Sequence, residues 1–86
     1  MKLIVNVKAG GLKTNREKAG LSQSELSKKS GINIRTIQGL ECGQKDLNHS
    51  RLITLLKLCN ALDCTLSSLI TDEETLSELE KYEKRW

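Results

Sequence analysis

The sequence contains no proline, and its only aromatic residues are Tyr82 and Trp86. Leucine and isoleucine therefore have to build the interior, which suits the close packing of short helices. No stretch approaches the roughly 18 consecutive apolar residues that a membrane-spanning helix requires, so we expect no contact with a membrane. The 86 residues are enough for one domain with a single core.

Metal ligands are also scarce. No two of Cys42, Cys59 and Cys64 are two residues apart, and His49 is the only histidine, which argues against a structural zinc site. Cys59 lies in an apolar helical run, where a thiol packs as a small hydrophobe. An odd number of thiols fits a reducing compartment, and residues 1–11 are too short and too mixed for a secretory signal. We therefore expect a cytoplasmic protein with no metal site and no cofactor.

The groups that an active site needs are missing as well. The sequence has no glycine-rich phosphate loop and no nucleophile beside a base, so the roles of an active site go unfilled. We predict no catalytic residue and no enzyme activity, and we interpret His49 as a loop residue rather than a base.

Charge is present but unevenly distributed. Residues 1–51 hold ten basic and four acidic side chains, a net charge of +6, whereas residues 52–86 hold four basic and seven acidic ones, a net charge of −3. The basic half favours a polyanionic partner. Ordinary solvated surfaces explain the same asymmetry equally well, so charge alone does not decide.

Three segments are expected. Residues 1–11 form an arm or a short strand, because Leu3, Val5 and Val7 alternate with mostly polar neighbours before two glycines. Residues 12–70 form a helical domain, and residues 71–86 form a C-terminal helix with acids in its first turn and bases in its last.

The central domain divides into five short helices. The first runs from about residue 12 to 18, and a capping box of Ser22 and Glu25 opens the second, which ends at Ser30–Gly31. Asn33 caps the third, which ends before Gly43. Leu47 is expected in the core, and Thr65 caps the fifth helix. In the fourth helix, the predicted buried stripe is Leu52, Leu55, Leu56, Cys59 and Leu62.

The third helix has two chemically different sides. At about 100° per residue, Ile37 and Leu40 fall on one side and anchor the helix inward. Arg35, Gln38 and Gly39 fall on the other side, together with Cys42 and, at the edge, Ile34. Arginine and glutamine are the side chains best suited to forked hydrogen bonds with guanine and adenine, and Ile34 suits a thymine methyl group. Exposed polar residues on a surface helix give the same pattern without any ligand.

A glycine in mid-helix costs about 1 kcal/mol relative to alanine, so Gly39 calls for a reason. Either its missing side chain permits close approach of DNA to the helix backbone, or the position is simply unread. Phosphate contacts are expected from helix starts and loop edges. The residues expected to make them are Ser22, Gln23, Thr36, Lys45, Asn48 and Arg51.

The stretch LSQSELSKKSGINIRTIQGLECG, with LKTNREKAG before it and LLKLCNALDCTLSSLI after it, resembles the lambda-repressor-like helix-turn-helix family of phage repressors, Cro proteins and bacterial (XRE-type) regulators. The resemblance covers about residues 12–70. It implies an all-α bundle of five helices that binds operator DNA as a two-fold dimer. In this chain a C-terminal helix and a short N-terminal arm are added to that bundle.

The resemblance also implies roles for individual residues. Gln23 matches a phosphate-contacting glutamine, and Arg16 and Glu41 match an Arg–Glu pair with Arg16 near the phosphates. The positions matching those that contact bases or adjacent backbone are Asn33, Ile34, Arg35, Gln38 and Gly39. The sequence departs from the family at Ser27 and Ser30, where alanine and an apolar residue are common, and at Gly39, which removes a side chain often used for base readout.

These observations support a sequence-specific transcriptional regulator, a repressor acting as a dimer on double-stranded DNA. The alternative is the antitoxin of a toxin–antitoxin pair, in which residues 72–86 or 2–8 bind a partner protein and the domain also binds its own operator. The two hypotheses are compatible.

Overall fold

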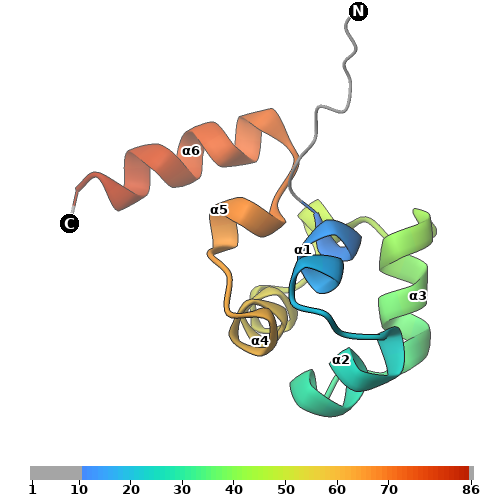
Figure 1. Cartoon of the computed structure of the whole chain (residues 1–86). Coiled ribbons are helices and arrows are strands. Elements are labelled where there is room, and N and C mark those ends of the chain that lie inside the picture. The colour runs from blue at the N-terminus through green and yellow to red at the C-terminus, as the bar shows by residue number, and fades with distance from the viewer. Residues whose placement is uncertain (1–10, 86) are drawn as a thin grey trace, which may run out of the picture.

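The computed structural model describes residues 11–85, and these residues form helices and connecting loops without a strand. The all-α prediction is therefore confirmed for the described part of the chain, while the arm or strand expected before residue 11 lies outside it. The elements in chain order are α1 (Leu12–Lys18), α2 (Gln23–Ser30), α3 (Ile34–Cys42), the 3-10 helix η2 (Leu47–His49), α4 (Leu52–Leu62), α5 (Leu66–Leu69) and α6 (Glu73–Glu83) (Figure 1). No helix among them is long and apolar enough to cross a membrane.

Leucine and isoleucine build the core, as the composition requires. The four largest fully buried side chains are Leu26, Ile37, Leu58 and Leu69, one from each of α2, α3, α4 and α5. Each such side chain stabilises the fold by about 1.5–3 kcal/mol when it leaves water. Helix α2 packs on α3 and α4, and α1 packs on α3 and α5. Helices α1–α5 therefore share one core.

Local capping fixes where the helices of the central motif begin and end. The Ser22 hydroxyl accepts from the Glu25 N–H at 3.0 Å, and the Ser22 N–H donates to the Glu25 carboxylate at 2.8 Å, so the predicted capping box is present. The Asn33 side chain accepts from the Arg35 N–H at 2.8 Å. Gly31 and Gly43 end α2 and α3 in the left-handed conformation (φ 78° and 88°) that glycine adopts without strain.

The two serines that depart from the family pattern stabilise the turn between α2 and α3. Ser27 Oγ donates to the Ile32 carbonyl at 2.6 Å, and Ser30 Oγ accepts from the Ile32 N–H at 3.1 Å. Both polar groups of the Ile32 backbone are therefore satisfied while its side chain is buried. The serine hydroxyls thus serve the turn, in place of the apolar contacts that alanine would make.

The predicted buried stripe of α4 is wrong at two positions. Leu52 and Leu56 are 61% and 43% exposed, and the buried residues are Leu55, Leu58, Cys59, Ala61 and Leu62. Helices α2 and α5 cover α4, and the buried side centres near Leu58 and Leu62, roughly a quarter turn or more from Leu52 and Leu56 at about 100° per residue. With Ile53, also exposed, these two leucines leave an apolar surface on α4.

The C-terminal helix is present but peripheral. It lies beside α5 and extends away from α2 and α3 (Figure 1). None of its residues is buried; Leu76 packs partly against the core and Tyr82 is exposed. Asp72 caps it, accepting from the Thr75 N–H at 2.9 Å, and two glutamates lie in its first turn, as the helix dipole favours.

Candidate nucleic-acid interface

Helix α3 is held by its apolar side. Ile37 is fully buried and Leu40 is 8% exposed, so the predicted inward anchors are confirmed. Arg35, Gln38 and Cys42 lie exposed on the other side, which we call the open face of α3. Within residues 11–85, the side chains of Arg35 and Gln38 make no hydrogen bond or ion pair. Their donors are therefore available to a ligand that approaches this face.

The edges of the open face are more enclosed. Ile34 and Thr36 are half-buried in the first turn of α3, and Asn33 is exposed just before it. The side-chain oxygen Oδ1 of Asn33 accepts the capping bond from the Arg35 N–H, which leaves the side-chain NH₂ group as a donor. Asn33 therefore combines a structural role with a free donor beside Arg35.

The predicted Arg16–Glu41 pair is present and includes a third residue. Arg16 Nε and Nη2 donate to the two Glu41 carboxylate oxygens at 2.7 and 3.1 Å, and Gln23 Nε2 donates to the same carboxylate at 2.9 Å. The Arg16 and Glu41 side chains are only 12% and 5% exposed. This network joins α1, α2 and α3, so it fixes the start of α2 relative to the open face.

The network also sets the protonation state of the carboxyl group. Burial alone would raise the pKa of Glu41, but the hydrogen bonds from Arg16 and Gln23 and the nearby positive charge outweigh it and lower that pKa from its ordinary value. The hydrogen bond to Glu41 correspondingly raises the pKa of Arg16. Arg16 Nη1 also donates to the Leu21 carbonyl at 2.7 Å. Most of the guanidinium is therefore committed inside the protein, and a phosphate contact by Arg16 stays a prediction.

Lys13, which the sequence analysis does not single out, lies beside the Arg16–Glu41 network. Together with Gln23, Gln38, Glu41 and Cys42 it lines a shallow depression where α1, α2 and α3 meet. Its ammonium group supplies positive charge there, and one coulombic effect of Lys13 is to lower the pKa of Glu41. The available signal was its position three residues before Arg16, which places both on the same side of a helix.

The expectation that Gly39 lies open on the DNA-facing side is wrong. Gly39 is buried, because the aliphatic part of Lys45 lies across it; a Cβ atom at residue 39 would come within 3.2 Å of Lys45 Cγ, Cδ and Cε. The Lys45 N–H also donates to the Gly39 carbonyl at 3.0 Å. The lysine stem, rather than DNA, occupies the space that the missing side chain leaves.

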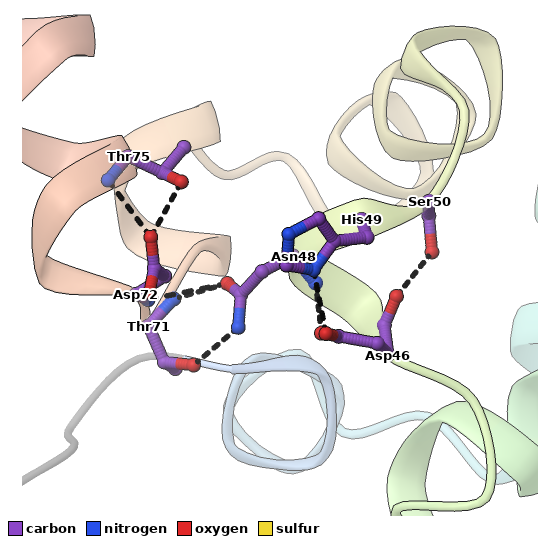
Figure 2. A network of polar contacts seen from close by, with 7 residues as sticks. All are labelled: Asp46, Asn48, His49, Ser50, Thr71, Asp72 and Thr75. Carbon is purple, nitrogen blue, oxygen red and sulfur yellow. Dashed lines mark hydrogen bonds and ion pairs between the residues drawn. The ribbon is translucent and has the colours of Figure 1, made fainter.

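The Asn48 side chain makes hydrogen bonds within the protein, and the phosphate contact expected from it stays a prediction. Its side-chain oxygen Oδ1 accepts from the N–H groups of Thr71 and Asp72 at 3.0 and 3.2 Å, and its side-chain NH₂ group donates to the Thr71 hydroxyl at 3.3 Å. Figure 2 shows this side chain between η2 and the start of α6. Asn48 therefore joins the loop after α3 to the C-terminal helix.

The remaining charged residues of that loop are exposed. His49 Nδ1 lies 2.6 Å from Asp46 Oδ2, and the hydrogen bond raises the pKa of His49 and lowers that of Asp46 (Figure 2). Lys45 is exposed as a residue, and Arg51 is exposed at the N-cap of α4. Ser22 is exposed at the start of α2. Phosphate contacts by Ser22, Gln23, Thr36 and Arg51 stay predictions.

Two short helices joined by a tight turn, the second with an outward polar side, define a helix-turn-helix protein. A family model described as helix-turn-helix (HTH_3) matches residues 12–69. The chain belongs to this lambda-repressor-like, XRE-type family of DNA-binding transcription regulators. No curated protein and no solved structure matched the chain.

Proposed function

We propose that the protein is a sequence-specific, cytoplasmic transcriptional repressor that acts as a homodimer on operator DNA. The observation that carries the proposal is the orientation of α3: Ile37 and Leu40 hold it inward while Arg35 and Gln38 project from its open face without an intramolecular partner among residues 11–85. Repression follows by occlusion, because a bound dimer covers the sites that the transcription machinery needs.

The chemistry of the open face suits the major groove. In the proposal, Arg35 donates from both arms of its guanidinium to guanine O6 and N7, and Gln38 pairs with adenine N6 and N7. Ile34 is half-buried at the edge of this face and suits a thymine methyl group. The free NH₂ group of Asn33 adds a donor at the N-terminal end of the helix.

Backbone contacts would position this face on the duplex. The first turn of α2 offers free N–H groups, the Ser22 hydroxyl and the second hydrogen of the Gln23 amide. Arg16 acts here through its hold on Glu41, which in turn fixes Gln23. Thr36 and Arg51 complete the proposed phosphate contacts, which carry no sequence information themselves.

The exposed apolar side chains of α4 support the proposal that the protein forms a dimer. Leu52, Ile53 and Leu56 are 61%, 52% and 43% exposed within two turns of one helix. A second copy covers such a surface symmetrically, because the same apolar residues face one another across a two-fold axis. Two recognition helices then reach successive major grooves about 34–36 Å apart.

Selection from a randomised DNA library tests the proposal. We expect enrichment of two inverted half-sites with centres about one helical turn, or 10–10.5 base pairs, apart. The matched control is the double variant Arg35→Ala/Gln38→Ala, which keeps the inward anchors and should lose the enrichment while retaining weak, salt-sensitive binding. A flat selection by the wild-type protein would contradict sequence-specific function.

The antitoxin function is a second candidate, favoured by one observation. Helix α6 has no buried residue, although it carries the partly buried Leu76 and Leu79 and the exposed Tyr82 on one side. A partner protein bound to residues 72–86 would cover such a helix and leave α3 free, and residues 2–8 are the alternative partner segment. This candidate function predicts that a toxin gene lies beside this one, and that deleting residues 72–86 abolishes binding of that toxin and spares DNA binding. Toxin binding that survives the deletion would contradict a role of α6.

A further inference from the structure

Gly39 is not required by the backbone of α3. Its φ lies outside the positive range that favours glycine, whereas four other glycines of the described chain lie within that range. A glycine inside a helix costs about 1 kcal/mol relative to alanine. The structural feature that favours glycine here is space, because the three atoms nearest to a Cβ at residue 39 would be Cγ, Cδ and Cε of Lys45, each at 3.2 Å.

Lys45 reaches this place from the loop after α3. Its N–H group donates to the Gly39 carbonyl at 3.0 Å, which anchors the loop one turn back along the helix. Its stem then lies across residue 39, on the same half of α3 as Arg35 and Cys42 at about 100° per residue. The Lys45 ammonium, one bond beyond Cε, makes no ion pair within residues 11–85.

We propose that Lys45 is a specificity-determining residue that donates to a base edge from the position that Gly39 leaves empty. The inference rests on the proposed function and replaces the phosphate contact expected for this residue. Lysine donates to guanine O6 and N7 in the major groove, so the proposed target is a guanine beside the base pair that Arg35 contacts. In this proposal the Lys45 side chain makes the base contact that a side chain at residue 39 would otherwise make.

Packing explains why the lysine suits this task. A free lysine loses rotamer freedom when it binds, and that loss weakens the contact. Here the stem already rests on the backbone of α3, so part of the ordering precedes DNA binding. A Cβ at residue 39 would require the stem to move by a few tenths of an ångström, and we expect the ammonium to move with it.

The test compares Lys45→Met with the wild-type protein on operator variants that differ at single base pairs, at one salt concentration. Methionine keeps an unbranched apolar stem and removes the charge. We expect discrimination at one guanine to fall about tenfold or more, while the preferences at other positions persist. Lys57→Met, which removes an exposed lysine of α4, is the matched control and should keep every preference. Equal weakening on all variants, with a salt slope lower by about one unit, would show a phosphate contact and overturn the inference.

Gly39→Ala tests the role of the missing side chain. We expect a several-fold loss of discrimination at the same guanine, although the net charge is unchanged and the helix gains propensity. In the Lys45→Met background, Gly39→Ala should cause no further loss at that base pair, since both changes act on one contact. Unchanged discrimination by Gly39→Ala would show that the glycine does not position the lysine. If the wild-type protein selects no site at all, the proposed function fails first, and that result differs from both outcomes above.

Discussion

At the scale of single residues, most side chains of the candidate interface already make contacts within the protein. Glu41 receives hydrogen bonds from Arg16 and Gln23, Asn33 caps α3, and Lys45 covers Gly39. Arg35 and Gln38 have no such intramolecular use within residues 11–85. The division identifies which substitutions should change stability and which should change DNA recognition alone.

The first prediction concerns Glu41→Gln. The carboxylate is held by two charged hydrogen bonds and is almost inaccessible, so we expect a loss of about 1–3 kcal/mol in the free energy of unfolding. Because the pKa of Glu41 is lowered in the folded state, its contribution is present above the unfolded pKa of about 4.3 and is lost as the pH falls through the folded pKa.

Chemical denaturation from pH 7 to pH 3 measures this effect. The stability difference between the wild-type protein and Glu41→Gln should shrink below about pH 4. Glu17→Gln, at an exposed position of α1, is the control and should stay within about 0.5 kcal/mol of the wild type. A difference that is constant over this range would mean that the charge of Glu41 is not what the network uses.

At the scale of helices and loops, features that depend only on residues close together in the sequence can be predicted from the sequence. The ends of α2 and α3 depend on Ser22, Gly31, Asn33 and Gly43, whose effects act within one turn, and these were predicted correctly. The open face of α3 follows from helical periodicity together with the inward anchors Ile37 and Leu40.

Contacts between distant parts of the chain were not predictable in the same way. Asn48 is 23 residues from Thr71, and a short polar side chain in a loop carries no signal of such a partner. Nothing in the sequence distinguishes Lys45 from other exposed lysines, because its contact with Gly39 forms only when the loop after α3 folds back. The error at Leu52 and Leu56 arose because an apolar pattern shows which residues are apolar but not which neighbouring helices cover them.

The second prediction belongs to this scale. Asn48→Ala removes the hydrogen bonds that hold residues 71 and 72, so the start of α6 should open more often. We expect faster amide hydrogen exchange at Thr71 and Asp72, with DNA affinity nearly unchanged. Asn60→Ala, at an exposed position of α4, is the control. Reduced DNA affinity with unaltered exchange would instead support the phosphate contact predicted for Asn48.

At the scale of the whole molecule, three regions separate in space. The core holds α1–α5 together, the open face of α3 is available to DNA, and α6 extends away from α2 and α3 (Figure 1). The exposed apolar side of α4 is a further surface. The proposed function needs such separation, because pairing with a second copy through α4 would have to leave the open face of α3 uncovered.

The third prediction tests the proposed dimer. Ile53→Glu places a charge on the exposed apolar side of α4 without disturbing a buried residue, since Ile53 is half exposed. We expect the variant to sediment as a monomer at concentrations where the wild-type protein is a dimer, with its thermal stability as a monomeric fold retained. Lys18→Glu, at an exposed position of α1 away from this surface, is the control and should remain dimeric. If the wild-type protein and Ile53→Glu sediment alike, the pairing surface lies elsewhere.

The central claim is that the open face of α3 contacts base edges, and the affinity of Arg35→Ala for single-base variants of the selected operator measures it most directly. Arg35 is exposed and outside the core, so the variant should fold as the wild type does. We predict a cost of about 1–3 kcal/mol, with preference relaxed at one base pair of each half-site and kept at the others. Undiminished affinity, or equal weakening on every variant, would contradict the account.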